Sequence, residues 1–314
     1  MLRAIVLGIV QGITEFLPIS SSAHLSIVPR LLGYATPTLA FEVLLHFGTL
    51  AAVVAYFARD LWAFVLCLVA PGRLGPEETR ARRRLLGLLA LASVPAAVVG
   101  FLLQDWADGQ TARPLRASVW LVLTTAILIA AELYDRSRRA RRPAPAPPGE
   151  LEGGEETVPA GRAGTRVARH HGRRSATVAG PVDAEQELAR LPVAKAAGIG
   201  LAQAVALIPG TSRSGVTISA GLFQGVSREA AARFSFLLSI PAILGAGILK
   251  LDELSGATET PLQLAAGTVA AAVSGFLAVS FLIRLLRTRT LWPFIWYRLA
   301  AGALFVLLLT TVRS

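Results

Sequence analysis

Residues 11–24, QGITEFLPISSSAH, place a glutamate, three serines and a histidine inside sequence that is otherwise apolar. Gln11 and Glu15 are four residues apart, so a helix would carry both on one face. Pro18 then ends that helix, because its ring and its missing N–H disrupt the backbone hydrogen-bond ladder. Serines before a new apolar run are good N-caps, so a second short helix is expected directly after them. The stretch therefore predicts a broken helix that carries a carboxylate, hydroxyls and an imidazole.

A second stretch in the other half of the chain matches the first. Residues 207–212, LIPGTS, align with residues 16–21, FLPISS. Both read as two apolar residues, Pro, a variable residue, Ser or Thr, and Ser. Interrupted hydrophobic segments in corresponding halves are typical of internally repeated membrane proteins whose site lies at the repeat interface. The two turns are therefore expected to form one site.

The composition indicates an all-α polytopic membrane protein. The 314 residues are 54% hydrophobic and 16% charged, whereas soluble proteins are roughly a quarter charged. Several apolar runs reach about 20 residues, the length that crosses a bilayer core. The net charge of +11 does not indicate nucleic acid, because the arginines cluster between the apolar runs, where retention on the cytoplasmic face explains them. Cys67 is the only cysteine, so no intramolecular disulfide or cysteine-based metal cage is expected.

The chain divides into two membrane repeats and a linker. The first repeat, residues 1–134, has a re-entrant pair at about 1–33 and spans at about 38–58, 85–104 and 115–134. Residues 135–192, rich in Pro, Gly, Arg and Glu, are interpreted as a disordered linker, and the neighbouring His170 and His171 as part of it. The second repeat, residues 193–314, has a re-entrant pair at about 193–225 and spans at about 229–250, 262–284 and 291–312.

The charge distribution predicts which segments are cytoplasmic. The 59–84 loop, the linker and the 284–290 turn are rich in arginine, which places them on the cytoplasmic face. The acidic 105–110 turn and 251–260 loop fall on the other face, and so do both termini. Each half then crosses the membrane an odd number of times, so the two repeats are predicted to be inverted.

Arg213 is the most informative residue of the second turn. It lies in a Ser-Arg-Ser-Gly sequence between apolar segments, where an arginine at membrane depth needs a partner. Its planar fork suits a phosphate or a carboxylate. Gly210 and Gly215 allow a tight turn, and the hydroxyls around them add donors. We expect an anion site rather than a headgroup anchor, because serines and glycines flank the arginine on both sides.

The other polar side chains leave more than one interpretation open. Glu15 is a structural partner of the arginine, a metal ligand or a base, since intramembrane carboxylates are functional by default. His24, beside three serines, is either a hydrogen-bonded polar residue that faces a cavity or a residue that transfers protons, and the second interpretation is favoured. Glu42 and His46 share one helix face and either line the same cavity or form a buried hydrogen-bonded pair.

These residues resemble the two signatures of the undecaprenyl-diphosphate phosphatases of the bacitracin-resistance type. One signature is (Glu/Gln)-x-x-x-Glu followed by a Ser-rich turn with His, and the other is Pro-Gly-x-Ser-Arg-Ser-x-x-Thr. The resemblance extends to FEVLLHFGT at 41–49, FSFLLSIP at 234–241 and WPFIWYR at 292–298, so it covers nearly the whole chain apart from the linker. Gln11 stands where many members carry glutamate, and Ser22 where threonine is frequent.

The resemblance implies an integral membrane phosphatase that converts undecaprenyl diphosphate to undecaprenyl phosphate and inorganic phosphate. That reaction recycles the lipid carrier of peptidoglycan and cell-wall synthesis and confers bacitracin resistance. It also implies a multi-pass protein of the bacterial plasma membrane, with an active site at the extracytoplasmic side or the membrane midplane. The expected partners are a long-chain polyprenyl diphosphate and membrane lipids, without nucleic acid, and the expected cofactor is Mg²⁺ or Ca²⁺. Self-association into a homo-oligomer stays open.

Carried over by position, the resemblance makes Glu15, Ser21, His24 and Arg213 the catalytic residues. The diphosphate-binding residues would be Ser20, Ser22, Gly210, Ser212, Arg213, Ser214 and Thr217. Glu15 would be the metal ligand, with Gln11 or Glu42. Ser21 is the preferred nucleophile, activated by His24 or Glu15, and direct attack by water is the alternative.

A lipid-phosphate flippase or transporter is the competing function. Inverted repeats with broken helices at the midplane are typical of transporters. An enzyme releases inorganic phosphate in detergent, where no second compartment exists, and a flippase does not.

Overall fold

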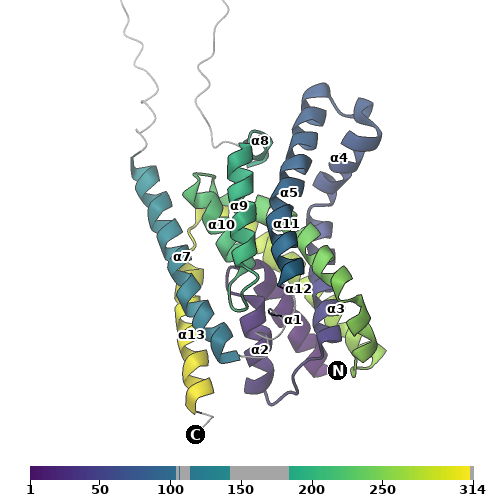
Figure 1. The fold of residues 1–314 in the computed structure, drawn as a ribbon, viewed down its shortest axis with the longest axis vertical. Coiled ribbons are helices and arrows are strands. Elements are labelled where there is room, and N and C mark those ends of the chain that lie inside the picture. The colour runs from purple at the N-terminus through teal and green to yellow at the C-terminus, as the bar shows by residue number, and fades with distance from the viewer. Residues whose placement is uncertain (104–105, 107–113, 142–183, 312–314) are drawn as a thin grey trace, which may run out of the picture.

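The computed structural model describes residues 1–103, 106, 114–141 and 184–311, and the regular structure of these residues is helical throughout (Figure 1). The first half contains α1 (Leu2–Phe16), α2 (Ser21–Leu31), α3 (Leu39–Tyr56), α4 (Ala58–Val69), the 3-10 helix η1 (Pro71–Arg73), α5 (Pro76–Leu102) and α7 (Pro114–Ala140). The second contains α8 (Ala184–Ala189), α9 (Val193–Val205), α10 (Arg213–Phe223), α11 (Arg228–Leu249), the 3-10 helix η2 (Leu251–Gly256), α12 (Pro261–Thr288) and α13 (Trp292–Thr311). Of the helices described, α3, α5, α7, α11, α12 and α13 are long and apolar enough to cross a membrane. The predicted fold class, an all-α polytopic membrane protein, is confirmed.

Two pairs of short helices meet through their turns. In Figure 1 the α1–α2 pair lies toward the end of the molecule that holds both termini, and the α9–α10 pair lies toward the opposite end. The backbone N–H of Gly210 donates to Ser22 Oγ at 3.0 Å, and Ser214 Oγ donates to the Leu17 carbonyl at 3.1 Å. The two motifs thus form one polar junction in the interior. The division into two inverted repeats stays a prediction.

Close packing against α12 fixes the position of α1. A Cβ atom added at Gly12 would lie 2.0 Å from Ser274 Oγ, and one added at Gly8 would lie 2.2 Å from the Gly267 carbonyl oxygen. Such small-residue contacts let membrane helices approach closely, because dispersion then acts along both backbones. At the end of α1, Phe16 packs edge-on against Phe236 of α11, with ring centroids 5.5 Å apart.

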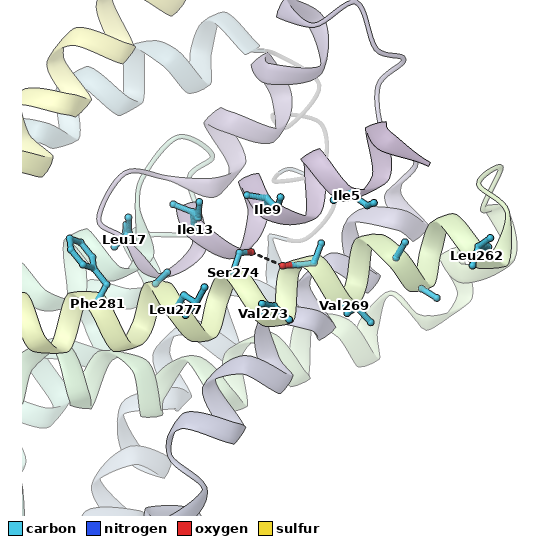
Figure 2. Close-up of a pocket in the computed structure, with 14 residues that line it drawn as sticks. Ile5, Ile9, Ile13, Leu17, Leu262, Val269, Val273, Ser274, Leu277 and Phe281 are labelled. Atoms are coloured by element: carbon cyan, nitrogen blue, oxygen red, sulfur yellow. Dashed lines mark hydrogen bonds between the residues drawn. The ribbon is translucent and has the colours of Figure 1, made fainter.

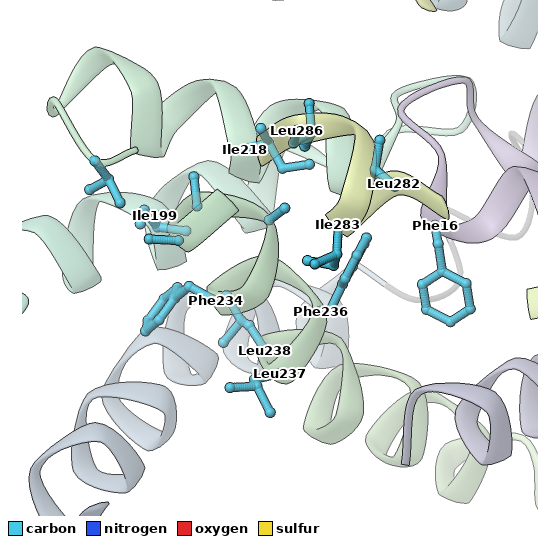
Figure 3. Packing of buried hydrophobic residues seen from close by; sticks show 14 of the residues in the cluster. Phe16, Ile199, Ile218, Phe234, Phe236, Leu237, Leu238, Leu282, Ile283 and Leu286 are labelled. Carbon is cyan, nitrogen blue, oxygen red and sulfur yellow. The ribbon is translucent and has the colours of Figure 1, made fainter. Parts of the chain in front are cut away.

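The main apolar core surrounds the second helix pair. Figure 3 shows Phe16 beside side chains of α10, α11 and α12, among them Ile218, Phe236 and Leu282, and all four are buried. This core holds the ends of α1 and α10 against the same set of spanning helices. The polar residues that follow Phe16 and those that begin α10 are therefore brought to one place.

The predicted loop at 59–84 is instead largely helical. The chain forms α4 and η1 there, and α5 begins at Pro76 rather than at about residue 85. Pro76 is suited to the first turn of a helix, and Glu77 and Glu78 follow it, where carboxylates favour the helix dipole. Arg82 pairs with Asp60 at 2.6 Å and with Glu78 at 3.7 Å. The arginines therefore extend a helix rather than interrupt it.

The ends of the predicted linker are also helical. α7 continues to Ala140 and α8 occupies residues 184–189, whereas residues 142–183, including His170 and His171, lie outside the described residues. Ion pairs explain the extra turns. Asp135 pairs with Arg139 at 2.9 Å within α7, and Glu185 of α8 pairs with Arg233 of α11 at 2.9 Å. The predicted 105–110 turn is likewise outside the described residues except for residue 106.

Candidate active site

Glu15 is the centre of the polar junction. Its Oε1 accepts a hydrogen bond from the guanidinium of Arg213 at 2.8 Å. Its Oε2 accepts from Ser21 Oγ at 2.6 Å and from Gln11 Nε2 at 3.1 Å. The carboxylate side chain is only 7% exposed. A carboxylate removed from water needs such charged and polar donors, so the two turns are joined by one ion pair. The predicted partnership of Glu15 and Arg213 is present.

Arg213 begins α10 and points back to the first turn. Besides the contact to Glu15, its other terminal nitrogen donates to the Ser239 carbonyl at 3.4 Å. The side chain is 17% exposed. The guanidinium therefore lies within the protein, held between α1 and α11, and not at the outer surface where a headgroup anchor would lie.

The serine turn contains the one backbone position with positive φ among the described non-glycine residues. Ser20 has φ +73°, a region that costs a side-chain-bearing residue free energy. Its carbonyl accepts a hydrogen bond from His24 Nδ1 at 2.7 Å. Its Oγ lies 3.3 Å from Ser22 Oγ. The turn thus exposes the hydroxyl of Ser21 to Glu15 while the neighbouring backbone is held in a strained conformation.

His24 turns away from Glu15. Its Nδ1 donates to the Ser20 carbonyl, so in a neutral ring its Nε2 accepts from the Tyr297 hydroxyl, 2.7 Å away. The ring stacks on Tyr297 and meets the edge of Phe305. Within the described residues, the hydrogen bonds do not join His24 to Ser21 or Glu15. The proton-transfer role of His24 stays a prediction, and the contacts support a role in shaping the turn.

The second turn depends on glycine and on capping hydroxyls. Gly210 has φ +92°, and a Cβ there would lie 2.1 Å from the Ala117 carbonyl oxygen, so only glycine fits. Ser212 caps α10 by accepting from the Gly215 N–H at 3.2 Å, and its Oγ lies 3.2 Å from Ser214 Oγ. Thr217 lies one turn further along α10, where its hydroxyl donates to the Arg213 carbonyl at 2.8 Å. The predicted phosphate-binding hydroxyls therefore lie around Arg213.

Sequence reasoning did not single out Arg298, which is fully buried. It donates to the carbonyls of Pro18 at 3.1 Å and Leu121 at 2.9 Å, to Thr125 Oγ1 at 2.8 Å, and to Thr124 Oγ1. The arginine thus ties the break between α1 and α2 to α7. An arginine inside the apolar residues of a predicted span was the available signal, because such a charge requires internal partners.

His46 is the second residue whose place the sequence did not determine. Its Nε2 lies 3.7 Å from Glu15 Oε2, and its Nδ1 donates to the Glu42 carbonyl at 2.8 Å. The side chain is 39% exposed. Of the two interpretations given for the Glu42–His46 pair, the structure is nearer to the first, because it brings the imidazole of His46 to within 3.7 Å of the Glu15 carboxylate.

The described residues contain no group of three or more His, Cys, Asp or Glu side chains that could hold a metal ion. Mg²⁺ is commonly bound by one or two carboxylates together with substrate phosphates and water, so this donor set fits a cation that arrives with a phosphate. Gln11 Oε1 is buried and has no hydrogen-bond partner in the described structure, although the amide N–H₂ of Gln11 is bonded to Glu15. An unused oxygen ligand therefore lies on a residue that touches Glu15.

An apolar groove of about 940 Å³ runs between α1 and α12 (Figure 2). Ile9, Ile13 and Leu17 line it from α1 at four-residue spacing, whereas Gln11 and Glu15 occupy the other face of that helix. Leu17 also provides the carbonyl that accepts from Ser214. The groove thus ends at the junction of the two turns.

Fold and site together define a class: a multi-pass helical membrane protein with a buried carboxylate–guanidinium pair between two hydroxyl-rich turns. The chain belongs to the bacitracin resistance protein BacA family, whose model matches residues 4–304. It is 39% identical over 317 residues to an undecaprenyl-diphosphatase of Pelobacter propionicus, covering 99% of this chain and 98% of that protein. The identity to the undecaprenyl-diphosphatase of Thermomicrobium roseum is 41%, covering 99% of both chains. That of Alcanivorax borkumensis is 41% identical, covering 96% of both. The family resemblance of the two motifs is confirmed.

Proposed function

We propose that this protein hydrolyses undecaprenyl diphosphate to undecaprenyl phosphate and inorganic phosphate, which recycles the lipid carrier for cell-wall synthesis and confers bacitracin resistance. Family membership and the activity named for the relatives support the proposal. The observation that carries it is the Glu15–Ser21–Arg213 arrangement. A hydroxyl 2.6 Å from a carboxylate, which is itself paired with a guanidinium, is suited to phosphoryl transfer.

Ser21 is the nucleophile that the geometry favours. Its Oγ attacks the terminal phosphorus while its proton passes to Glu15 Oε2, the atom to which it is already hydrogen-bonded. The bond from phosphorus to the bridging oxygen breaks, and undecaprenyl phosphate leaves. Glu15 then releases that proton to solvent. It next takes a proton from the water that attacks the phosphoserine, the bond from phosphorus to Ser21 Oγ breaks so that inorganic phosphate departs, and the proton on Glu15 returns to Ser21 Oγ. Direct attack of a water activated by Glu15 is the alternative route.

Arg213 supplies positive charge at the transferred phosphoryl group. Phosphoryl transfer passes through a loose transition state, so positioning and charge neutralisation provide most of the catalysis. The guanidinium and the amino-terminal end of α10 lie at the same turn, and both favour an anion. A divalent cation, Mg²⁺ or Ca²⁺ from the family expectation, would be held by Glu15 with Gln11 or Glu42 and would neutralise further charge on the diphosphate.

The groove between α1 and α12 is the proposed site of the polyprenyl tail. Its lining is apolar except for Ser274, and Leu17 places its end beside the second turn. Arginine-rich α4–α5, the end of α7 and α8 lie at the end of the molecule opposite the termini (Figure 1). The positive-inside rule makes that end cytoplasmic in the plasma membrane. The active site then faces the extracytoplasmic side or the midplane.

Phosphate release by purified protein tests this function. Protein in detergent is given a long-chain polyprenyl diphosphate, with and without a chelator, and inorganic phosphate is measured. Wild-type protein is expected to release phosphate, and Glu15→Gln is expected to lose at least about a thousandfold in turnover, because a base is removed. Transport of the intact lipid in vesicles, without phosphate release in detergent, would instead identify the flippase.

A further inference from the structure

The hydrogen bond of His46 to its own helix determines which ring nitrogen faces Glu15. Its Nδ1 lies 2.8 Å from the Glu42 carbonyl oxygen, which can only accept, so Nδ1 carries a proton. In a neutral ring the other nitrogen, Nε2, is then a lone-pair donor to a metal. That nitrogen lies 3.7 Å from Glu15 Oε2.

Two electron-rich atoms that face each other at a suitable distance can share one cation between them. Bonds from metal to imidazole nitrogen or carboxylate oxygen are about 2.0–2.2 Å long, so two ligand atoms of one ion lie roughly 3–4 Å apart. The observed separation of 3.7 Å falls in that range. The buried Oε1 of Gln11, which has no partner among the described residues, belongs to the side chain bonded to the same carboxylate.

We propose that His46 Nε2 and Glu15 Oε2 together bind the divalent cation of this enzyme, with oxygens of the substrate diphosphate completing its coordination. This inference rests on the proposed phosphatase function. Gln11 offers only a neutral amide oxygen beside Glu15, so the imidazole of His46 adds a second strong ligand to the site. His46 is 39% exposed whereas Glu15 is 7% exposed, so the imidazole forms the side of the site open to an arriving ion.

The donor set has a consequence for the choice of metal. Imidazole nitrogen is a good ligand for first-row transition ions, whereas Mg²⁺ and Ca²⁺ prefer oxygen. A site with one imidazole nitrogen therefore favours Mn²⁺ over Ca²⁺. This preference is expected to fall when His46 is replaced by a residue that offers only oxygen.

Pulsed electron paramagnetic resonance of bound Mn²⁺ tests the proposal without relying on turnover. Full-length protein in detergent is stripped with a chelator and loaded with Mn²⁺ and methylenediphosphonate, a diphosphate that cannot be hydrolysed. Wild-type protein is expected to show the modulation of a directly bound imidazole ¹⁴N. His46→Gln is expected to lose that signal and to bind Mn²⁺ about tenfold or more weakly. His24→Gln is the matched control and should keep the signal, because His24 is bonded to Ser20 and Tyr297.

The outcomes separate this inference from the function it rests on. Mn²⁺ bound to wild-type protein without ¹⁴N modulation would overturn it, and so would a signal that survives in His46→Gln or disappears only in His24→Gln. Phosphate release from polyprenyl diphosphate is measured on the same preparation. Activity without the imidazole signal would support the phosphatase function and would reject His46 as a metal ligand.

Discussion

The two turns that meet at the active site share a sequence pattern but divide the chemistry between them. In the alignment of residues 16–21 with residues 207–212, Glu15 corresponds to Ala206 and Arg213 corresponds to Ser22. The first turn therefore provides the carboxylate and the second the guanidinium, and each has a neutral residue where the other is charged. Neither charge would be tolerated alone at membrane depth, whereas together they form a pair at 2.8 Å.

The turns also achieve their bends differently. The first places a serine at φ +73° and is held by the side chains of His24 and Arg298. The second uses Gly210 at φ +92°, with the backbone against Ala117. The first turn thus depends on distant side chains and the second on the absence of one. Replacing residues in the two turns should therefore have different consequences.

The largest effect is expected from the charge of the second turn. Arg213→Lys keeps the charge but loses the planar fork, so turnover should fall by about a hundredfold or more at equal yield of folded protein. Arg287→Lys is the matched control, because the Arg287 side chain is 56% exposed and its ion pair with Glu229 lies at the protein surface. Near wild-type turnover of Arg213→Lys would show that the planar fork of Arg213 does not bind the diphosphate. The serine hydroxyls and backbone donors would then be the phosphate site.

The backbone of the second turn is tested by Gly210→Ala. The added methyl would lie 2.1 Å from the Ala117 carbonyl oxygen at a positive φ, so the protein should lose about 2 kcal/mol or more of stability. Gly245→Ala is the control, since a Cβ there meets nothing within 4 Å. Thermal unfolding in detergent measures both variants. Equal melting temperatures would show that the turn can relax and that its bend does not require glycine.

The apolar side of α1 is tested with a bulky residue. Ala265→Trp would fill part of the groove beside α1, and KM for the C55 diphosphate should rise roughly three- to tenfold, which corresponds to about 1 kcal/mol. KM for a C15 diphosphate should change little, because a short tail needs less of the groove. Ala300→Trp places the same side chain at an exposed position on α13. If both tryptophans act alike on both substrates, the tail binds elsewhere.

The smallest effect is expected at Glu259, which lies outside the membrane spans and contacts Arg3 and Thr38. Burial raises the pKa of Glu259, but hydrogen bonds from Thr38 and the charge of Arg3 outweigh it and hold that pKa below its ordinary value. A lowered carboxyl pKa adds stability above the unfolded pKa, and this stability disappears as pH falls through the folded pKa.

Glu259→Gln should therefore lower the free energy of unfolding at pH 7 by less than about 1 kcal/mol, seen as a slightly lower melting temperature. The difference from wild type should shrink as pH falls below the ordinary carboxyl range. It should vanish only once the pH is below the lowered pKa of Glu259 in the folded protein, where the wild-type carboxyl is protonated as well. Melting curves across this range measure it. A difference that persists unchanged in acid would mean that Glu259 acts through its shape rather than its charge.

The sequence predicted the features that depend on local pattern. The spans follow from apolar length, and the broken helices follow from Pro18 and its counterpart in the second motif. The partnership of Glu15 and Arg213 followed from the cost of two unpaired charges in apolar surroundings. These arguments use the residues themselves and need no knowledge of how the helices are arranged.

The features that sequence reasoning missed depend on packing between distant helices. His46 reaches Glu15 because both α1 and α3 lie close against α12, where Gly8, Gly12 and Gly48 leave room for the α12 backbone. His24 and Arg298 meet their partners only after α13 lies beside α2 and α7. The helical arginines of α5 were missed because charge was interpreted as a sign of a loop, whereas Asp60 and Glu78 pair with Arg82 on neighbouring turns.

The ion pair between Glu15 and Arg213 also bears on which membrane lipids the protein ignores. An anion that takes over the nitrogen of Arg213 facing Glu15 must displace a carboxylate bound at 2.8 Å. The phosphodiester headgroup of an ordinary phospholipid brings a single negative charge, so it gains little by that exchange. A terminal diphosphate brings several charges, and its arrival also frees the carboxylate to act on Ser21. The resting pair is therefore expected to favour a terminal diphosphate over the single charge of a bulk phospholipid.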